Sequence, residues 1–493
     1  MVEQELRDLI TQIKKRGFEE QTTEVKAAHK GCPEKLYDTI SAFSNQDSGG
    51  TIVFGLDEKN DFAEVGVYDP QDLQKKIMEA CEQMTPIVRP VFTVCDKDDH
   101  VFVSAEIPPL DITERPCFKT ARGRMQGSFI RVGDADKPMT EYEIYSFEAF
   151  RKKYRDDIRT LEDVSMNLLD KSKIEIYLAL KQKQRPNLAL LEKNQQYELN
   201  GITRSGKITM LSLLLFGLYP QATFPQLGII ASVVPGNEIG DTDSNGNRFI
   251  DSKRIEGTIP EMLEGAVTFV GRNMQTAIRI DPITGERVDT PQYPLNAVRE
   301  VILNALVHRD YSLHTENMPI QLLMFSDRLE VINPGGLYGR ITVDKLGDVQ
   351  PETRNPSLVT GMEILGESEN RYSGIPTIRK MMADAALPAP EFIDNHVNFR
   401  VILYNRNHAE HLISSDSDNS PAAKEKDTRN IIDFCRTPRS RDEIVSYLGI
   451  PSRQYALKRY LEPLVESGEI QMTNPASPRS RSQKFVAADK KGA

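Results

Sequence analysis

One segment constrains the fold of this chain more than any other. Residues 295–310 have the composition of an apolar helix, yet a polar residue recurs at every fourth position, as Asn296, Glu300, Asn304 and His308. In an α-helix this spacing places the four side chains on one stripe. A carboxylate, an amide and an imidazole in line on an otherwise apolar helix predict that the helix holds a polar ligand.

Two strands and two turns follow this helix. Strands are expected at 319–325 and 328–332, and a glycine-rich turn, Asn333–Gly336, comes directly after them. Glycines there would let the backbone approach a ligand closely. A second turn, 372–376, opens a helix expected at 377–386, and the N-terminus of a helix favours phosphate groups. The order of these elements indicates a nucleotide together with its metal ion.

Glu300 and Asn304 lie one helical turn apart and supply complementary chemistry. The Glu300 carboxylate could activate water, and the Asn304 amide oxygen could ligate a hard cation such as Mg²⁺. The order of elements resembles the ATP-binding module of the superfamily that joins gyrase, heat-shock chaperones, histidine kinases and MutL, in its divergent RecG-like C-terminal form. Three stretches contain the resemblance: Arg299–Tyr311, Arg328–Gly336 and Arg371–Ile375.

The resemblance covers roughly residues 196–407 and implies a Bergerat-type (GHKL) α/β sandwich that binds ATP with Mg²⁺. It implies that Glu300 is a general base and Asn304 a Mg²⁺ ligand. The implied nucleotide contacts come from Asn333, Gly335, Gly336, Ser373 and Gly374. Two positions depart from the family pattern, because Asn333 replaces the adenine-binding aspartate and Tyr372 stands where the phosphate loop often has glycine. ATP binding is therefore expected, whereas hydrolysis stays open.

Two other motifs imitate nucleotide-binding signatures. His308-Arg309-Asp310 copies a kinase catalytic-loop triplet, but no asparagine follows at the kinase spacing and no kinase glycine-rich loop precedes it. Gly201–Lys207 copies a phosphate loop, but Ile208 stands where serine or threonine would bind Mg²⁺. We interpret both as coincidence, so the chain is not expected to be a helicase motor.

Residues 1–150 are expected to form an α/β module with a second group of acidic residues. If 24–26 is a strand, Glu24 and Lys26 lie on one face of it, and Asp57 ends the strand expected at 51–56. Together with Glu19, these carboxylates could hold a divalent metal ion for phosphodiester cleavage. Acidic residues at strand ends are also common on plain surfaces, so binding without cleavage is the alternative.

The N-terminal module resembles the Schlafen-type AlbA-like domain. The resemblance rests on Glu19–Lys26, Ala42–Asn45, Gly49–Asp57 and Phe129–Gly133. It implies nucleic-acid binding, and in some eukaryotic relatives the positions that match Glu19, Glu24 and Asp57 belong to a ribonuclease. The basic residues expected at phosphates are Lys26, Arg122 and Arg124, with a solvated loop as the alternative for the two arginines.

Residues 427–493 are locally basic on an acidic chain. They contain 12 Lys/Arg and 8 Asp/Glu, a net charge of +4, so the remainder of this chain of net charge −10 carries −14. Helices are expected at 428–436, 440–448 and 452–467, followed by a β-hairpin at 470–486, which indicates a winged helix. Its expected nucleic-acid contacts are Arg453, Lys458, Arg459, Arg479, Arg481 and Lys484. Winged helices also contact proteins, but the charge favours DNA.

Composition limits the remaining possibilities. No apolar run approaches the roughly 20 residues that span a bilayer, and the five cysteines include no Cys-x-x-Cys pair. We therefore expect a cytoplasmic protein with reduced thiols, no zinc site and no membrane partner. A homodimer is expected only by analogy with relatives of the ATP module.

The sequence thus predicts a multidomain protein of the α/β (α+β) class. The expected parts are an AlbA-like module (1–150), a helical connector (151–195), a GHKL-like ATP module (196–410), a polar linker (411–426) and a winged helix (427–493). We expect an ATP-binding, DNA-binding transcriptional regulator whose DNA interaction ATP modulates. The alternatives are a metal-dependent nuclease on RNA or DNA, gated by ATP, and a scaffold whose ATP site has degenerated.

Overall fold

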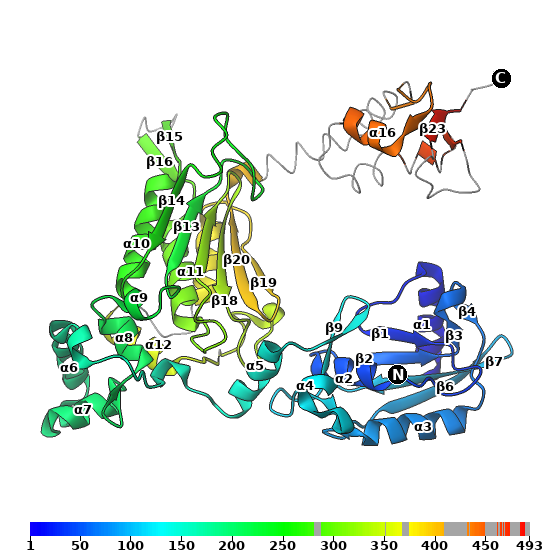
Figure 1. The fold of residues 1–493 in the computed structure, drawn as a ribbon, viewed down its shortest axis with the longest axis horizontal. Helices are drawn as coiled ribbons and strands as arrows, with labels where there is room; N and C mark the ends of the chain where they lie inside the picture. The colour runs from blue at the N-terminus through cyan, green and yellow to red at the C-terminus, as the bar shows by residue number, and fades with distance from the viewer. Residues whose placement is uncertain are drawn as a thin grey trace. The chain divides into compact units, whose positions relative to one another are not determined.

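The structure is a computed structural model with two compact units, Met1–Tyr404 and Asn405–Ala493 (Figure 1). It describes residues 1–280, 287–350, 352–366, 374–408, 431, 432, 434–448, 461, 464, 465, 467, 469–473 and 484–488. Both units contain helices and sheets, and the larger sheets of the first unit are mixed, so the expected α/β (α+β), multidomain class is confirmed.

The N-terminal part of the first unit is an α/β module built on a four-stranded mixed sheet. Its main elements are α1 (Glu3–Arg16), β1 (Thr23–Lys26), α2 (Tyr37–Asn45), β2 (Gly50–Phe54), α3 (Pro70–Glu82), β6 (Val91–Lys97) and β7 (His100–Ile107). The strand order is β1-β2-β7-β6, with β1 and β2 parallel and the other pairs antiparallel. Shorter elements complete it: β3 (Leu56–Asp57), η1 (Glu58–Asn60), β4 (Ala63–Glu64), β5 (Met84–Thr85), β8 (Phe118–Lys119), η2 (Thr120–Arg122), α4 (Gly123–Gly127), β9 (Phe129–Val132) and β10 (Ala135–Pro138).

Side-chain alternation along β2 explains why helices cover both faces of this sheet. Successive side chains of a strand point to opposite faces. Ile52 and Phe54 pack in the cluster that contains the buried residues of α2 and α3. Val53, between them, packs with Leu6 and Ile10 of α1. β2 is therefore buried on both faces, which explains why its residues Ile52, Val53 and Phe54 are all apolar.

The strand expected at 51–56 is broken in two at Gly55. This glycine has φ +111°, in the region that side-chain-bearing residues rarely adopt. A Cβ there would lie 2.7 Å from Cδ1 of Phe102. β2 therefore stops at Phe54, and Leu56 and Asp57 start the separate strand β3, which pairs with β4.

A helical segment leads into the second module of this unit. Its elements are α5 (Glu141–Arg151), η3 (Asp156–Ile158), η4 (Met166–Leu168), α6 (Lys171–Gln184), η5 (Pro186–Leu190), α7 (Lys193–Leu199), β11 (Thr203–Arg204), β12 (Lys207–Ile208), α8 (Met210–Phe216) and α9 (Pro220–Thr223). Leu161, Ile174 and Tyr177 belong to the same hydrophobic core as the sheet of the second module. Much of the segment expected as a connector thus packs as part of that module.

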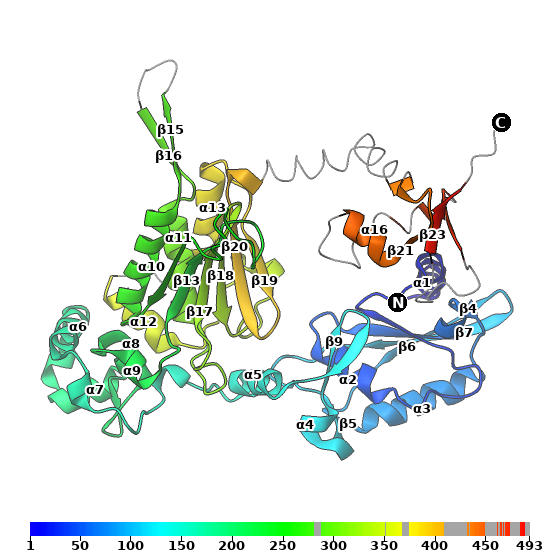
Figure 2. The same ribbon diagram turned by 45° about the horizontal axis from the view of Figure 1, so that its top comes forward.

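The second module is an α/β sandwich with a six-stranded sheet of order β14-β13-β17-β18-β20-β19. Its elements are β13 (Ile229–Val233), β14 (Asp251–Ile255), α10 (Ile259–Asn273), β15 (Thr276–Ile280), β16 (Arg287–Pro291), α11 (Leu295–His308), β17 (Ile320–Met324), β18 (Arg328–Pro334), η6 (Val343–Lys345), α12 (Pro356–Ile364), α13 (Gly374–Asp384), β19 (Glu391–Asp394) and β20 (Asn398–Tyr404). Helices α10, α11 and α13 lie together on one face of the sheet (Figure 2).

Helix α11 is the central helix of this layer. Its apolar residues Val298, Ile302 and Leu306 share the core with Leu322 of β17 and Val331 of β18. Because these apolar residues recur four positions apart, they lie on one side of α11, and this side packs against the sheet. The polar stripe predicted from the sequence is left for another side of the helix.

The second unit contains a small sheet and a small core. Its described elements are β21 (Arg439–Ser440), α16 (Arg441–Leu448), β22 (Ile470–Met472) and β23 (Lys484–Ala487), with the sheet order β21-β23-β22. Ile444 and Phe485 belong to its buried cluster. The expected helix at 440–448 and the ends of the expected hairpin are present. Residues 428–430 and 433 of the expected first helix, and most of 452–467, lie outside the described residues. The winged helix stays a prediction.

No helix among the residues that the structure describes combines the length and the apolar character needed to cross a bilayer.

Candidate functional site

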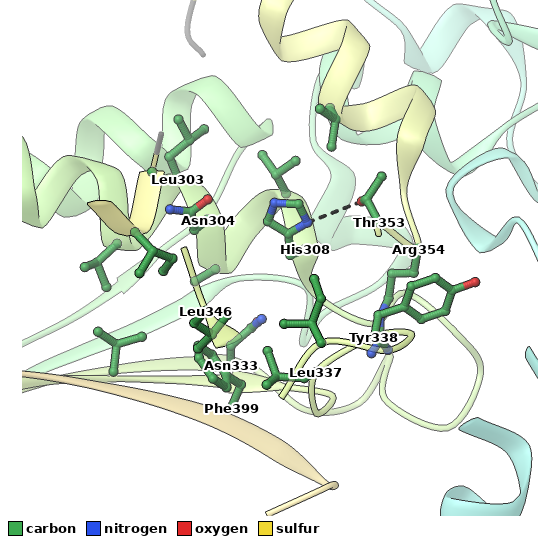
Figure 3. A pocket seen from close by; sticks show the side chains of 18 of the residues that line it. Leu303, Asn304, His308, Asn333, Leu337, Tyr338, Leu346, Thr353, Arg354 and Phe399 are labelled. Carbon is green, nitrogen blue, oxygen red and sulfur yellow. Dashed lines mark hydrogen bonds between the residues drawn. The ribbon is translucent and has the colours of Figure 1, made fainter. Parts of the chain in front are cut away.

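A cavity of about 380 Å³ opens beside α11 in the second module. Its walls come from α11, β18 with the turn after it, residues within 337–349 and 352–356, the first turns of α12, the start of α13 and β20. Asn304 and His308 face Asn333 and Phe399 across it (Figure 3). This volume is within the range of about 300–1,000 Å³ that small-molecule sites occupy.

Three of the four residues on the predicted polar stripe line this cavity. They are Glu300, Asn304 and His308, whereas Asn296 is exposed and is not among the lining residues. Asn304 Nδ2 donates a hydrogen bond to Glu300 Oε1 at 3.1 Å. Burial raises the pKa of Glu300 above its ordinary value, which makes this carboxylate a better proton acceptor near neutral pH.

Gly374 brings the N-terminus of α13 against this pair. A Cβ at Gly374 would lie 2.5 Å from Glu300 Oε1 and 3.0 Å from Asn304 Nδ2, so a larger residue would displace these two side-chain ends. α13 has 11 residues, and the free N–H groups at its start favour an anion. Ser373, the other residue expected at the phosphates, lies outside the described residues. A carboxylate, an amide oxygen and a helix N-terminus thus meet at one end of the cavity.

Asn333 and the two glycines after it line the opposite wall. Asn333 is 5% exposed, and its Oδ1 has no hydrogen-bond partner within the part of the chain that the structure describes. Gly335 has φ +96°, and a Cβ there would lie 2.7 Å from Cβ of Asp310. A Cβ at Gly336 would lie 2.7 Å from Asp394 Oδ1. The turn is therefore a tight glycine turn that follows a lining asparagine whose buried Oδ1 has no partner among the described residues.

The remainder of the cavity is largely apolar. Val331, Leu346, Ile375, Phe399 and Val401 line it. Few polar groups in an apolar slot are typical of sites that fix the orientation of a flat ligand such as a base.

His308 completes the stripe at the far end of the cavity. Its Nδ1 lies 3.3 Å from Thr353 Oγ1, and the ring is open to the cavity. Desolvation by the surrounding protein and the charge of Arg354 lower the pKa of His308 to about 4. The imidazole is therefore neutral at physiological pH and offers the cavity a hydrogen bond rather than a charge.

Arg354 is a cavity residue that the sequence did not reveal. Arg354 Nη1 lies 2.8 Å from Asp310 Oδ2, and Nη2 donates to the carbonyl oxygen of Gly336 at 2.7 Å. It comes from the segment between β18 and α12, far in sequence from α11 and outside the recognised motifs. Only the folded chain brings this guanidinium to the glycine turn.

The structure brings Glu19 and Glu24 together in the N-terminal module, but around an arginine. Arg131 Nη1 lies 2.7 Å from Glu24 Oε2 and 3.0 Å from Asp136 Oδ1, and Nη2 lies 3.4 Å from Glu19 Oε2. Lys26 also pairs with Glu24. The side chain of Arg131 is 1% exposed, so a buried positive charge lies among these carboxylates.

Asp57 does not join them. Its Oδ1 instead accepts a hydrogen bond from the backbone N–H of Lys59 at 3.2 Å and caps η1. Across the described ranges no three His, Cys, Asp or Glu side chains are grouped so that they could hold a metal ion. The structure thus brings Glu19 and Glu24 to Arg131 and places Asp57 apart from them, and a metal centre of these three residues stays a prediction.

The residues of this module that are expected to contact phosphates differ in whether an acidic side chain already pairs with them. Arg122 is exposed, with its guanidinium carbon 4.7 Å from the ring centre of Tyr37, and the Lys119 ammonium lies 4.3 Å from the same ring. Arg124 instead pairs with Glu148, and Lys26 with Glu24. Arg122 and Lys119 around Tyr37 thus form a small cationic and aromatic surface, which we call the Tyr37 surface.

In the second unit, Lys484 is exposed at the start of β23. The other expected nucleic-acid contacts there lie outside the described residues: Arg453, Lys458, Arg459, Arg479 and Arg481.

Comparison with protein families identifies the two modules of the first unit. Residues 317–403 match the model described as "Putative ATP-dependent DNA helicase recG C-terminal", an ATPase-like domain. Residues 19–140 match the model described as Schlafen, AlbA_2. The chain therefore combines a Schlafen AlbA_2 domain with an ATPase-like domain of the RecG C-terminal type, as the sequence motifs predicted. Such a combination indicates an ATP-dependent function related to DNA.

The match to the ATPase-like model begins after α11, so Glu300 and Asn304 are assigned to the site by geometry and motif alone. Residues 428–486 match the model described as "Filamentation induced by cAMP protein Fic-like, C-terminal domain".

Two solved structures are similar to this chain at low identity. The DIP2311 protein from Corynebacterium diphtheriae is 16% identical, with 98% of this chain and 97% of that chain covered and a TM-score of 0.39. The N-terminal domain of a "Putative ATP-dependent DNA Helicase RecG-related Protein" from Nitrosomonas europaea is 24% identical, with 27% and 93% covered and a TM-score of 0.23. No curated protein matches this chain.

Proposed function

We propose that this protein is an ATP-binding, DNA-binding regulator, and that ATP in the α11 cavity changes its affinity for DNA. The observation on which the proposal rests is the cavity itself. It combines an unsatisfied buried amide at Asn333 with the Glu300–Asn304 pair at the N-terminus of α13. These groups are complementary to the two ends of a nucleotide.

The residues present fit ATP with Mg²⁺. The orphan Oδ1 of Asn333 needs a donor, and the exocyclic amine of adenine is one. The apolar walls suit the base, and the start of α13 suits phosphate oxygens. Mg²⁺, held by the Asn304 amide oxygen, would neutralise phosphate charge.

Glu300 is suited to the general-base role. The hydrogen bond from Asn304 Nδ2 holds a Glu300 carboxylate oxygen at the end of the cavity where we propose the phosphates, and burial raises the pKa of this carboxylate. There it would accept a proton from an attacking water. If water does not reach this position, the same residues bind ATP without turnover, and ATP acts as a switch ligand.

DNA is the proposed second ligand. The Tyr37 surface joins exposed positive charge to an aromatic ring, the combination that binds phosphates and bases. The net charge of +4 on residues 427–493 supports a second DNA contact there, and transcriptional regulation is the finer role that we propose. We also propose that the working form is a homodimer, by analogy alone.

Cleavage of nucleic acid is not part of this proposal. The nuclease alternative needs a metal ion at Glu19 and Glu24, whereas Arg131 lies between these two carboxylates and Lys26 pairs with Glu24.

Titration calorimetry of the full chain with a non-hydrolysable ATP analogue and Mg²⁺ tests the proposal. Wild type should bind, and Asn304→Ala should lose most of the Mg²⁺ dependence of the affinity. The matched control is Asn200→Ala, an asparagine in the turn after α7 that does not line the cavity. Loss of binding in the control but not in Asn304→Ala would refute the assignment of the site.

A further inference from the structure

Helix α5 contacts both modules of the first unit through different side chains. We infer that α5 couples the nucleotide cavity to the AlbA_2 domain through a chain of contacts from Arg354 to Asp310 to Tyr142. The inference rests on the proposed function, because it needs a nucleotide in the cavity, and it adds the route by which that nucleotide is sensed.

One face of α5 belongs to the AlbA_2 domain. Ile144 is 4% exposed and packs with Ile130 and Met139, and Phe147 packs against the same cluster. On the same helix, Glu148 pairs with Arg124 of α4. Apolar packing together with an ion pair ties the orientation of α5 to this domain.

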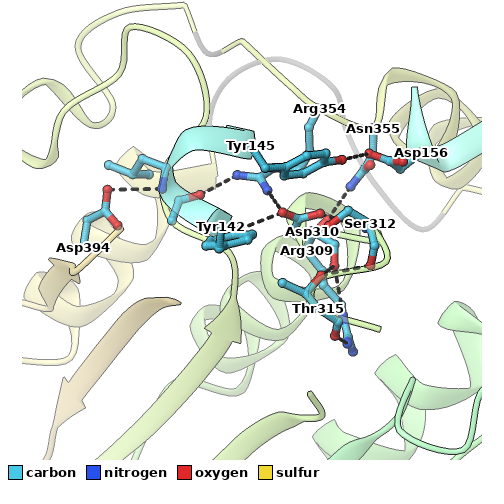
Figure 4. A network of polar contacts seen from close by, with 12 residues as sticks. Tyr142, Tyr145, Asp156, Arg309, Asp310, Ser312, Thr315, Arg354, Asn355 and Asp394 are labelled. Carbon is cyan, nitrogen blue, oxygen red and sulfur yellow. Dashed lines mark hydrogen bonds and ion pairs between the residues drawn. The ribbon is translucent and has the colours of Figure 1, made fainter. Parts of the chain in front are cut away.

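A different set of residues on α5 contacts the ATPase-like domain (Figure 4). The Tyr142 hydroxyl donates a hydrogen bond to Asp310 Oδ2 at 2.7 Å. The Tyr145 ring lies 4.5 Å from the His314 ring, centre to centre. The Phe150 and Tyr338 rings are 5.3 Å apart, edge to face. The Tyr145 and Phe150 contacts are between aromatic rings. The hydrogen bond of the Tyr142 hydroxyl is therefore the polar, directional contact of the three.

Asp310 is the centre of the chain of contacts. It is 3% exposed and receives hydrogen bonds from Tyr142 and from the backbone N–H of Ser312, the latter at 2.8 Å, besides its ion pair with Arg354. Burial alone would favour the neutral acid, but the Arg354 charge and these hydrogen bonds lower the pKa of Asp310. A buried, ionised carboxylate is sensitive to any shift of its arginine partner.

Of the three residues Arg354, Asp310 and Tyr142, Arg354 is the one that lines the cavity and can contact a ligand. It lines the cavity, holds the Gly336 carbonyl at 2.7 Å and lies over the Tyr338 ring at 5.2 Å. Its side chain is 10% exposed, yet its Nε–H has no hydrogen-bond partner among the residues described. A nucleotide oxygen or ring nitrogen that accepts this hydrogen changes how Arg354 divides its donors between Gly336 and Asp310.

The consequence is a linkage between two binding events. If the nucleotide binds more tightly when Arg354, Asp310 and Tyr142 are engaged, it stabilises α5 on the ATPase-like domain. By reciprocity, anything that orients α5 through the AlbA_2 domain, including bound DNA, changes nucleotide affinity by the same factor.

Hydrogen exchange of α5 in the full chain tests this inference, with and without a non-hydrolysable ATP analogue and Mg²⁺. The test variant is Tyr142→Phe, which removes the hydroxyl to Asp310 and keeps the ring. The matched control is Tyr145→Phe on the same helix, whose hydroxyl bonds instead to Asp156 at 2.8 Å. A second variant, Arg354→Lys, keeps the charge beside Asp310 and loses the second guanidinium contact.

In wild type the nucleotide should slow exchange of the α5 amides by about fivefold or more. Tyr142→Phe and Arg354→Lys should lose most of this protection, and Tyr145→Phe should keep it. A wild type that binds nucleotide without protection of α5, or equal effects of Tyr142→Phe and Tyr145→Phe, would overturn the coupling and leave the cavity assignment intact. Calorimetry that detects no nucleotide binding in wild type would overturn the proposed function and the coupling together.

Discussion

Replacing Asn333 with leucine is predicted to stabilise the ligand-free protein while it weakens nucleotide binding. Asn333 is 5% exposed, and its Oδ1 has no hydrogen-bond partner among the described residues. A buried polar atom without a partner costs about 1–3 kcal/mol. Leucine has a similar size and no polar atom, so the free energy of unfolding of the ATPase-like domain should rise by up to that amount.

Binding of the nucleotide should change in the opposite direction. In our proposal the adenine amine satisfies Oδ1 of Asn333, and leucine removes that hydrogen bond. The loss is about 1–3 kcal/mol of binding free energy. Because about 1.4 kcal/mol corresponds to a tenfold change in Kd, affinity should fall by between about fivefold and 150-fold.

Asn45→Leu is the matched control for this prediction. Asn45 is 2% exposed, but its Nδ2 donates to the Phe129 carbonyl at 2.9 Å and its Oδ1 accepts from the Cys117 N–H at 2.6 Å. Leucine there leaves two buried backbone groups unpaired, so it should destabilise the AlbA_2 domain. Nucleotide affinity should stay within about twofold of wild type, since the cavity is untouched.

Thermal unfolding and titration calorimetry of the full chain measure both effects. For a domain of this size, 1 kcal/mol corresponds to a shift of about 2–4 °C in Tm. The reasoning is refuted if Asn333→Leu lowers the Tm as Asn45→Leu does and leaves the Kd for the nucleotide unchanged. That result would mean that Oδ1 of Asn333 is satisfied in the ligand-free protein and plays no part in binding.

Three further predictions concern other parts of the chain. Gly374→Ala should weaken nucleotide binding by about tenfold or more in calorimetry, because the new Cβ would lie 2.5 Å from Glu300 Oε1. Glu19→Gln should flatten the pH dependence of stability between about pH 4.5 and 7 in unfolding experiments. Burial and the Glu24 charge raise the pKa of Glu19 from 4.5 to about 7, so the folded state holds the proton more tightly, and stability is full below pH 4.5 and falls as the pH rises to 7. Arg122→Ala at the Tyr37 surface should weaken binding to duplex DNA of any sequence and reduce the slope of log K against log salt by about one, measured by fluorescence anisotropy.

The part of the site that follows from local periodicity was predictable. Glu300, Asn304 and His308 line one cavity because residues four positions apart lie on the same side of a helix with 3.6 residues per turn, and this spacing can be read from the sequence. The Asn333–Gly336 turn was predictable because glycines directly after a strand mark a close backbone approach. Asn296 shows the limit of the rule, since it shares the stripe but lies beyond the end of the cavity.

The residues that the sequence did not reveal act through tertiary contacts. Arg354 reaches the cavity from a segment without a motif, and Arg131 meets Glu19 and Glu24 across more than 100 positions of chain. A list of carboxylates cannot show which arginine will lie between them. The sequence therefore did not show that Arg131 lies between Glu19 and Glu24, or that Asp57 caps the neighbouring η1 turn.

The break at Gly55 shows how the fold departed from its expected strand boundaries. The run from Thr51 to Leu56 is mostly apolar and begins with three β-branched residues, so it was predicted as one strand in spite of Gly55 within it. The reason is the side chain of Phe102, which occupies the space where a Cβ at residue 55 would lie.

The most direct test of the central claim is the affinity of the full chain for a non-hydrolysable ATP analogue with Mg²⁺, measured by calorimetry in the absence and presence of duplex DNA. We predict binding that Asn304→Ala weakens, with an affinity that DNA shifts by about fivefold or more in the direction in which the analogue shifts DNA affinity. The absence of any heat at millimolar analogue, or an affinity that neither DNA nor Asn304→Ala changes, would contradict the claim that this cavity binds ATP and controls DNA binding.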